Sequence, residues 1–177
     1  MTNLVKENTL VSYEENLLGY PVLLENVVIE RQYEDGEVTY EIPDLDGLTA
    51  AVAVARALLP LQLSGPEIKF LRKAMGKTAK QLADDMDSSP ETVSRWERDQ
   101  QMGGYAEKLL RDLVFAELKD KAPGVPVPDH AVAYMKVKRR VEGNTEMPKF
   151  VFTRHLMITK GDGIERKETW DCLKEAA

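Results

Sequence analysis

Cysteine and histidine are scarce in this chain of 177 residues, which holds one cysteine and two histidines. The single thiol of Cys172 excludes an internal disulfide and a cysteine-built metal cage. No apolar run approaches the roughly 20 residues of a membrane span. The start, MTNLVKENTLVSYEENLLGY, lacks the basic and apolar regions of a signal peptide. We therefore expect a cytoplasmic protein that contacts no membrane and needs no metal or other cofactor.

Signatures of catalysis are also missing. Gly103-Gly104 is too short to form a phosphate-binding loop. Cys172 with His155 or His130 works as a nucleophile and base only if a third group orients the pair, and the sequence offers none. The two histidines do not have the spacing of metal ligands. We expect that the protein is not an enzyme.

Positive charge is in short supply, since the net charge is −6. Residues 1–60 hold 3 Lys/Arg against 11 Asp/Glu, residues 61–122 hold 11 against 11, and residues 123–177 hold 10 against 8. The excess acid therefore lies in the N-terminal third, which cannot rest on nucleic-acid phosphates. Because complementary charge steers association, this segment favours a basic protein partner. The alternative is a merely solvated acidic surface.

Three short helices with clear ends are predicted between Gly65 and Asp99. A proline inside a first turn costs no hydrogen bond, a glycine ends a helix, and Ser or Thr caps a helix start. Val93 and Trp96 face inward in the third helix, which leaves its other face free for a partner. The breaks are marked by Pro66, Gly76, Thr78 and Ser89-Pro90-Glu91, and the second helix has an apolar stripe of Leu82, Ala83 and Met86.

The run Leu82-Ala83-x4-Ser88-Ser89-x3-Val93-Ser94-Arg95-Trp96-Glu97 resembles the Xre/Cro-CI family of phage-repressor-like DNA-binding domains. Their typical pattern is T-Q-x-x-L-A-x-x-x-G-V-S-x-x-x-V-S-x-W-E, and the resemblance covers roughly residues 65–120. It implies a helix-turn-helix fold and a homodimer on a palindromic operator in double-stranded DNA. The departures are Ala79 for a glutamine, Ser88 for a valine, and Asp87 for the turn glycine, where Asp tolerates the left-handed conformation better than most residues.

Upstream, two β-rich runs, Val22–Arg31 and Glu37–Ile42, flank Asp35-Gly36, which is a good hairpin signal. A hairpin that leads into a helix resembles the zinc-ribbon/helix-turn-helix antitoxins of the MqsA (YgiT-type) group, whose hairpin ends in C-x-x-C-G-E. The corresponding run here is Gln32-Tyr33-Glu34-Asp35-Gly36-Glu37. Gln32 and Asp35 replace the cysteines and cannot make a tetrahedral zinc site, so we expect a metal-free ribbon.

The third helix of a helix-turn-helix presents its first residues to the major groove. Arg95 is the best candidate base reader because arginine reaches guanine O6 and N7 together, and it matches an arginine in the antitoxin family's recognition helix. Glu91 falls where that family has an asparagine reader. Its carboxylate accepts from cytosine N4 but repels phosphate.

Further residues have supporting roles. Arg72 and Glu97 match a family pair that joins the first and third helices by a salt bridge, and we interpret them as structural. Contacts to the DNA backbone add salt dependence rather than specificity. The secondary base candidates are Ser89 and Ser94, and the candidate phosphate contacts are Lys69, Lys73, Lys77, Lys80 and Arg98.

The predicted fold class is α+β, with β structure at both ends and an all-α domain between. Residues 46–60 are apolar nearly all round, so this helix forms part of a dimer interface or, alternatively, packs only in its own core. The C-terminal strands are expected at 131–143 and 149–158, joined as a hairpin. The predicted regions are an acidic β-ribbon-like region over 1–45 that begins with a polar arm over 1–16, a connecting helix over 46–60, a helix-turn-helix domain over 61–122, a linker over 123–130 and a β-rich extension over 131–177.

The sequence thus favours a sequence-specific transcriptional regulator, an antitoxin-like autorepressor of a toxin–antitoxin operon whose acidic N-terminal region meets a basic toxin. Two alternatives stay open. One is a phage or mobile-element repressor without a toxin. The other is a protein-interaction adaptor whose helix-turn-helix no longer binds DNA, a reading favoured by Glu91 and by the neutral charge of residues 61–122.

Overall fold

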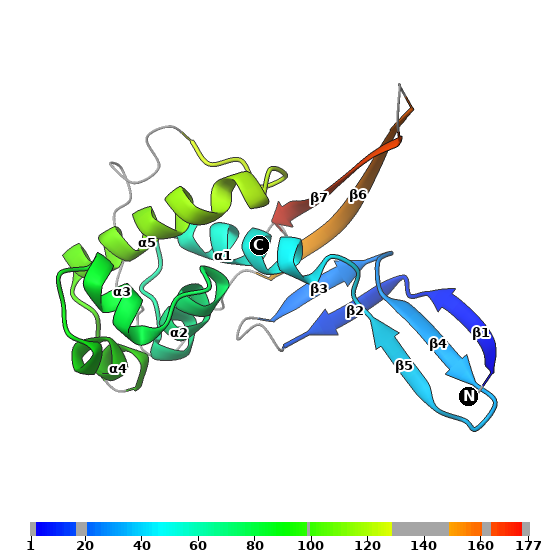
Figure 1. Ribbon diagram of the computed structural model, residues 1–177, viewed down its shortest axis with the longest axis horizontal. Coiled ribbons are helices and arrows are strands. Elements are labelled where there is room, and N and C mark those ends of the chain that lie inside the picture. Colours follow the sequence, from blue (N-terminus) through cyan, green and yellow to red (C-terminus); the bar gives the residue numbers. More distant parts are fainter. Residues whose placement is uncertain (1–2, 17–20, 99, 129–148, 161–163, 175–177) are drawn as a thin grey trace. The chain divides into compact units, whose positions relative to one another are not determined.

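The chain folds as two compact units joined twice by the backbone. The computed structural model describes residues 3–16, 21–98, 100–128, 149–160 and 164–174 (Figure 1). Met1–Leu48 and Pro148–Ala177 form a β unit, and Thr49–Met147 form a helical unit. The helical unit is therefore an insertion in the chain of the β unit. The two end regions that the sequence suggested as separate are one folded body.

The β unit contains two sheets. One has the strand order β1-β4-β5 and is antiparallel, and the other has the order β2-β3-β6-β7 with β3 and β6 parallel. Parallel pairing of Val22–Glu25 with Phe150–Thr153 joins the two ends of the chain. The strands are β1 (Leu4–Thr9), β2 (Ser12–Glu15), β3 (Val22–Glu25), β4 (Ile29–Tyr33), β5 (Val38–Glu41), β6 (Phe150–Lys160) and β7 (Ile164–Lys174).

A break at Asn26 separates the two sheets. β1 pairs antiparallel with β4, with Thr9 opposite Ile29, and β2 pairs antiparallel with β3, with Ser12 opposite Glu25. The connection from β3 to β4 thus has one more residue than the connection from β1 to β2 that lies beside it. Asn26, in the longer connection, takes a left-handed φ of 54°. An extra residue bends a strand in this way, and asparagine tolerates that φ. The single strand predicted over Val22–Arg31 is therefore wrong, as is the polar arm over 1–16.

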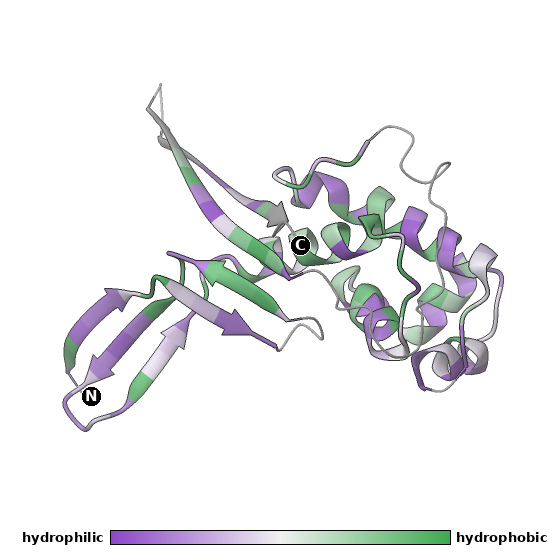
Figure 2. Ribbon diagram, turned by 180° about the vertical axis from the view of Figure 1, so that it is seen from behind, coloured by the Kyte–Doolittle hydropathy of each residue, from purple (hydrophilic) through white to green (hydrophobic). Residues whose placement is uncertain are grey.

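The core of the β unit lies on one face of the four-stranded sheet. Register places Val22, Leu24, Phe150 and Phe152 on that face, and all are fully buried. Trp170, which is 1% exposed, lies there too and donates its indole N–H to Asp44 Oδ2 at 3.0 Å. Figure 2 shows hydrophobic colour along β3 and the start of β6 and mainly hydrophilic colour on β1 and β4. The C-terminal strands therefore supply much of the core of a unit that begins at the N-terminus.

The helical unit holds most of α1 and all of the later helices. Asp44 Oδ1 accepts from the backbone N–H of Gly47 at 3.1 Å, which caps the start of α1. Every side chain from Ala50 to Ala57 is buried, so α1 has little surface left for a second copy, and its role as a core helix is favoured. The helices are α1 (Leu45–Leu58), α2 (Gly65–Ala74), α3 (Ala79–Asp85), α4 (Pro90–Arg98), α5 (Gly104–Leu118) and the 3₁₀ turn η1 (Lys119–Lys121).

The C-terminal predictions have mixed outcomes. A strand at 149–158 is confirmed as β6, but it pairs with β7 over Ile164–Lys174. The predicted strand over 131–143 and the hairpin turn at 142–147 lie outside the described residues. Ala122, just before the predicted linker, and Val125 within it are buried, so the chain still packs on the helical unit at these positions.

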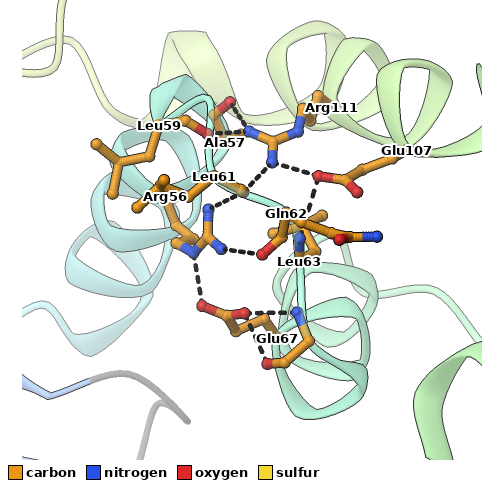
Figure 3. Close-up of polar contacts among 10 residues, drawn as sticks. Arg56, Ala57, Leu59, Leu61, Gln62, Leu63, Glu67, Glu107 and Arg111 are labelled. Carbon is orange, nitrogen blue, oxygen red and sulfur yellow. Dashed lines mark hydrogen bonds and ion pairs between the residues drawn. The ribbon is translucent and has the colours of Figure 1, made fainter. Parts of the chain in front are cut away.

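Four buried charged side chains fasten the segment between α1 and α2 (Figure 3). Arg56 Nε donates to Glu67 Oε1 at 2.6 Å, and Arg111 donates to Glu107 Oε1 at 2.5 Å. The two guanidinium groups also donate to main-chain carbonyls, and the two carboxylates accept from the N–H groups of Leu63 and Ser64. The carbonyls are those of Ala57, Leu59, Leu61 and Gln62. Buried charges persist only when paired in this way.

Burial and charge pairing act in opposite directions on these groups. Burial lowers the pKa of the Arg111 guanidinium, although its bond to Glu107 opposes the change. For Glu67, burial alone would raise the pKa, but the bond and charge of Arg56, with two bonds from Ser64, hold it below the ordinary value. Glu67 therefore stabilises the fold as a carboxylate.

We expect Glu67→Gln to reduce stability at neutral pH and to matter less in acid. A depressed folded-state pKa adds stability that is complete above the unfolded-state value, about 4.5, and is lost as the pH falls through the folded-state value. The measurement is the free energy of urea unfolding of both proteins from pH 7 to pH 3. A difference that stays constant below pH 4.5 would contradict an ionised Glu67.

Candidate DNA-binding surface

Helices α3 and α4 form a helix-turn-helix whose ends are set by local residues. Thr78 caps α3 by accepting from the N–H of Gln81 at 3.2 Å, and Ser89 Oγ accepts from the N–H of Thr92 at the start of α4. Gly76 after α2 and Asp87 in the turn have left-handed φ values of 70° and 46°. The turn therefore closes with Asp in the position where the Xre/Cro-CI pattern has glycine.

Three features hold α4 against the helices beneath it. Val93 is fully buried, while Trp96 is only half-buried. A Cβ on Gly65 would lie 2.5 Å from the carbonyl oxygen of Glu97, so only glycine allows this close approach of α2 and α4. Arg72 binds the Glu97 carboxylate through Nε and Nη2 at 2.5 and 3.1 Å. The outer face of α4 is thus presented on a fixed backbone.

That outer face carries an open hollow. It is lined by Pro90, Glu91, Ser94, Arg95 and Arg98. Glu91, Arg95 and Arg98 are exposed, and Ser94 is half-buried. One anion and two cations therefore lie along one side of a two-turn helix, where each can reach a bound molecule.

The two arginines of the hollow have different restraints. Arg95 donates from Nη2 to Thr92 Oγ1 at 3.1 Å, and Thr92 Oγ1 lies 3.1 Å from Ser89 Oγ. Arg98 donates from Nε to the carbonyl of Ser94 at 3.2 Å. Both guanidinium groups keep further N–H donors for a ligand, because arginine carries five.

The comparison with protein families gives one match. A model described as helix-turn-helix matches residues 68–102. Those residues run from α2 through α4 and include the whole hollow. Residues 68–102 are a helix-turn-helix domain of the Xre/Cro-CI type. This domain points to a DNA-binding transcription regulator. Searches of curated proteins and of solved structures found no match.

The helix-turn-helix domain brings most of the predicted base-contacting residues together. Glu91, Ser94 and Arg95 share the hollow, whereas the Ser89 hydroxyl is used in the cap of α4. Among the predicted phosphate contacts, Arg98 also lines the hollow. Lys69, Lys73 and Lys80 are exposed but do not line it.

Lys77 has another role in this domain. Its ammonium pairs with Asp85 and Glu117, each at 3.0 Å, and these bonds raise its pKa, that from Asp85 most. Its side chain is 17% exposed. We therefore leave Lys77 out of the proposed phosphate contacts.

Two residues that position the hollow were missed in the sequence. Thr92 lies three residues after Ser89 and three before Arg95, a spacing that puts all three on one helix face, so this signal was available. Gly65 gave no signal beyond its place at a helix start, because the carbonyl that it approaches is more than 30 residues away in the chain.

Other kinds of site find little support in the part of the chain that is described. No group of three or more His, Cys, Asp or Glu side chains is placed to hold a metal ion there. No helix in those residues is long and apolar enough to cross a membrane. His155 pairs with Asp171 at 3.2 Å, and register puts His155 and Cys172 on opposite faces of β6 and β7. His130 lies outside the described residues.

Proposed function

We propose that this chain is a sequence-specific transcriptional regulator that binds a palindromic operator as a homodimer. The observation that supports this proposal most is the exposed Arg95, whose guanidinium is held over a hollow on the outer face of α4. A helix of this kind enters the major groove with its first turns, and two copies read half-sites about 34 Å apart.

The side chains of the hollow suggest what each would contact. Arg95 is suited to guanine, because two of its N–H groups match O6 and N7. Glu91 is suited to the amino group of cytosine, since a carboxylate only accepts hydrogen bonds when ionised. Arg98 and the exposed lysines would bind phosphates and contribute affinity that falls with salt.

We expect Arg95→Ala to remove most of the sequence preference. Loss of one bidentate base contact costs about 1–3 kcal/mol of discrimination, roughly 5- to 150-fold. The measurement is a gel shift on DNA from upstream of the chain's own gene, with a scrambled duplex as competitor. Lys108→Ala, an exposed cation on α5 outside the hollow, is the control. If the upstream duplex and the scrambled duplex compete equally well for the protein without substitutions, specific binding is refuted.

The antitoxin-like role has its main support in the charge of the β unit. Arg31 pairs with Glu7 and Glu41, and these bonds raise its pKa. Among the described residues, four further acids of β4 and its turn have no ion pair. They are Glu30, Glu34, Asp35 and Glu37. We propose that this surface meets a basic toxin encoded beside the regulator.

The toxin proposal is tested with the full chain. Because residues 1–48 fold together with residues 148–177, removal of the N-terminal segment would unfold the unit rather than remove one surface. Co-purification with the product of the neighbouring gene is expected, and it is expected to fail when the four acids are changed to Gln and Asn. Unchanged co-purification would exclude this surface as the docking site.

The adaptor alternative is favoured by Glu91 and by the balanced charge of residues 61–122, since a carboxylate near the groove repels phosphate. It predicts no DNA binding even at low salt. A regulator without a toxin predicts a specific gel shift but no bound neighbouring product.

A further inference from the structure

Arg95 would ordinarily be expected to pair with Glu91. The two lie four residues apart, with the acid N-terminal to the base, which is the favoured arrangement for an ion pair on a helix. The structure instead directs the Arg95 guanidinium to Thr92 Oγ1 at 3.1 Å. No Glu91–Arg95 ion pair occurs among the described residues, so the charges of Glu91 and Arg95 both stay available.

We propose that Thr92 is a positioning residue that keeps Arg95 away from Glu91 and aims its guanidinium outward. This inference rests on the proposed function, because it concerns how the same surface distinguishes DNA sequences. Ser89 and Thr92 form a short hydroxyl chain beneath the guanidinium, and both are half-buried.

The hydroxyls of Ser89 and Thr92 lie 3.1 Å apart, and either one can donate to the other. Ser89 Oγ accepts from the Thr92 N–H at 3.2 Å, and Thr92 Oγ1 accepts from Arg95. Each hydroxyl has one hydrogen and two acceptor lone pairs. One of the two hydroxyl hydrogens joins Ser89 and Thr92, and the other remains to donate elsewhere. Ser89 thus holds Thr92 in place through two bonds, and Thr92 in turn holds Arg95.

The consequence for recognition follows from side-chain freedom. An exposed arginine carries about 2 kcal/mol of rotamer entropy, which is lost when it binds a base. A guanidinium already held by Thr92 loses less of this freedom. Without the Thr92 hydroxyl, the favoured i, i+4 spacing would let Arg95 pair with the Glu91 carboxylate, and this ion pair would take both groups away from the DNA bases.

Thr92→Val keeps the shape of the side chain and removes the hydroxyl. We expect it to reduce the ratio of affinities for the upstream DNA and a scrambled duplex by about tenfold, within the range for one bidentate base contact. Thr92→Ser keeps the hydroxyl and is expected to keep the ratio. Adding Glu91→Gln to Thr92→Val removes the competing carboxylate and is expected to restore part of the discrimination that Arg95 provides.

The experiment measures Kd by fluorescence anisotropy for each protein on both duplexes at fixed salt, with helix content by circular dichroism as the folding control. If Thr92 had only a structural role, Thr92→Val would lower stability and leave the ratio of affinities unchanged. An unchanged ratio in Thr92→Val, or equal losses in Thr92→Val and Thr92→Ser, would overturn the inference.

A second readout needs no DNA and separates this inference from the proposed function. In ¹⁵N NMR of the free protein, the Arg95 Nη2 N–H that binds Thr92 is expected to exchange more slowly in the unmodified protein and in Thr92→Ser than in Thr92→Val combined with Glu91→Gln. If the unchanged protein shows this protection but no sequence preference, the proposed function fails and the positioning stands. If the protection is absent, the positioning itself is refuted.

Discussion

Arg111→Met is expected to destabilise the helical unit by about 3–5 kcal/mol, because it leaves a buried carboxylate without its cation. Arg111 is fully buried, and it donates to Glu107 and to the carbonyls of Ala57, Leu59 and Leu61. Such a loss is a large part of the 5–15 kcal/mol that stabilises a typical domain. The measurement is urea unfolding followed by tryptophan fluorescence.

The chain offers a clean reporter and a matched control for this experiment. It has two tryptophans, Trp96 in the helical unit and Trp170 in the β unit, so a Trp170→Phe background reports on the helical unit alone. The double variant Glu107→Gln with Arg111→Met removes both charges and is expected to lose less than Arg111→Met. A loss below about 1 kcal/mol, the value of an exposed pair, would contradict a buried network.

Trp170→Ala is expected to open the β unit while the helical unit stays folded. Truncating a buried aromatic side chain typically costs about 3–5 kcal/mol, and here the hydrogen bond to Asp44 is lost as well. The measurement is amide hydrogen exchange. Protection is expected to fall in both β3 and β6, which pair in parallel, and to persist in α2 to α4.

Trp170→Phe is the control, since it keeps most of the packing and removes only the indole donor. Its β3 and β6 are expected to stay protected. Equal loss of protection in α2 to α4 and in the β strands of Trp170→Ala would contradict two separate units.

Local chemistry explains what the sequence predicted well. Gly76, Thr78 and Asp87 shape the backbone only within a few residues of their own positions. Each has the conformation or hydrogen bond that its residue type favours. Helix ends of this kind depend on short-range geometry. The position of the helix-turn-helix, and with it the grouping of Glu91, Ser94 and Arg95, was therefore predictable.

Long-range pairing explains what the sequence did not predict. The parallel pairing of β3 with β6 joins segments more than 120 residues apart, and no periodicity within either strand reveals its partner. The same holds for Arg56 and Glu67, whose burial as a pair depends on how α1 and α2 meet. The left-handed conformation of Asn26 was not predicted, because the residues on both sides of it have a strand-like composition.

If α4 reads a DNA sequence, the unmodified full chain must bind one duplex far more tightly than another of the same length. The measurement is the Kd for a duplex from upstream of its own gene and for a scrambled duplex of equal length, both at about 0.15 M salt. We expect the upstream duplex to bind at least about 1000-fold more tightly, as it does for specific regulators. Equal affinity for both duplexes, or no binding to either one when the salt is lowered, would contradict it.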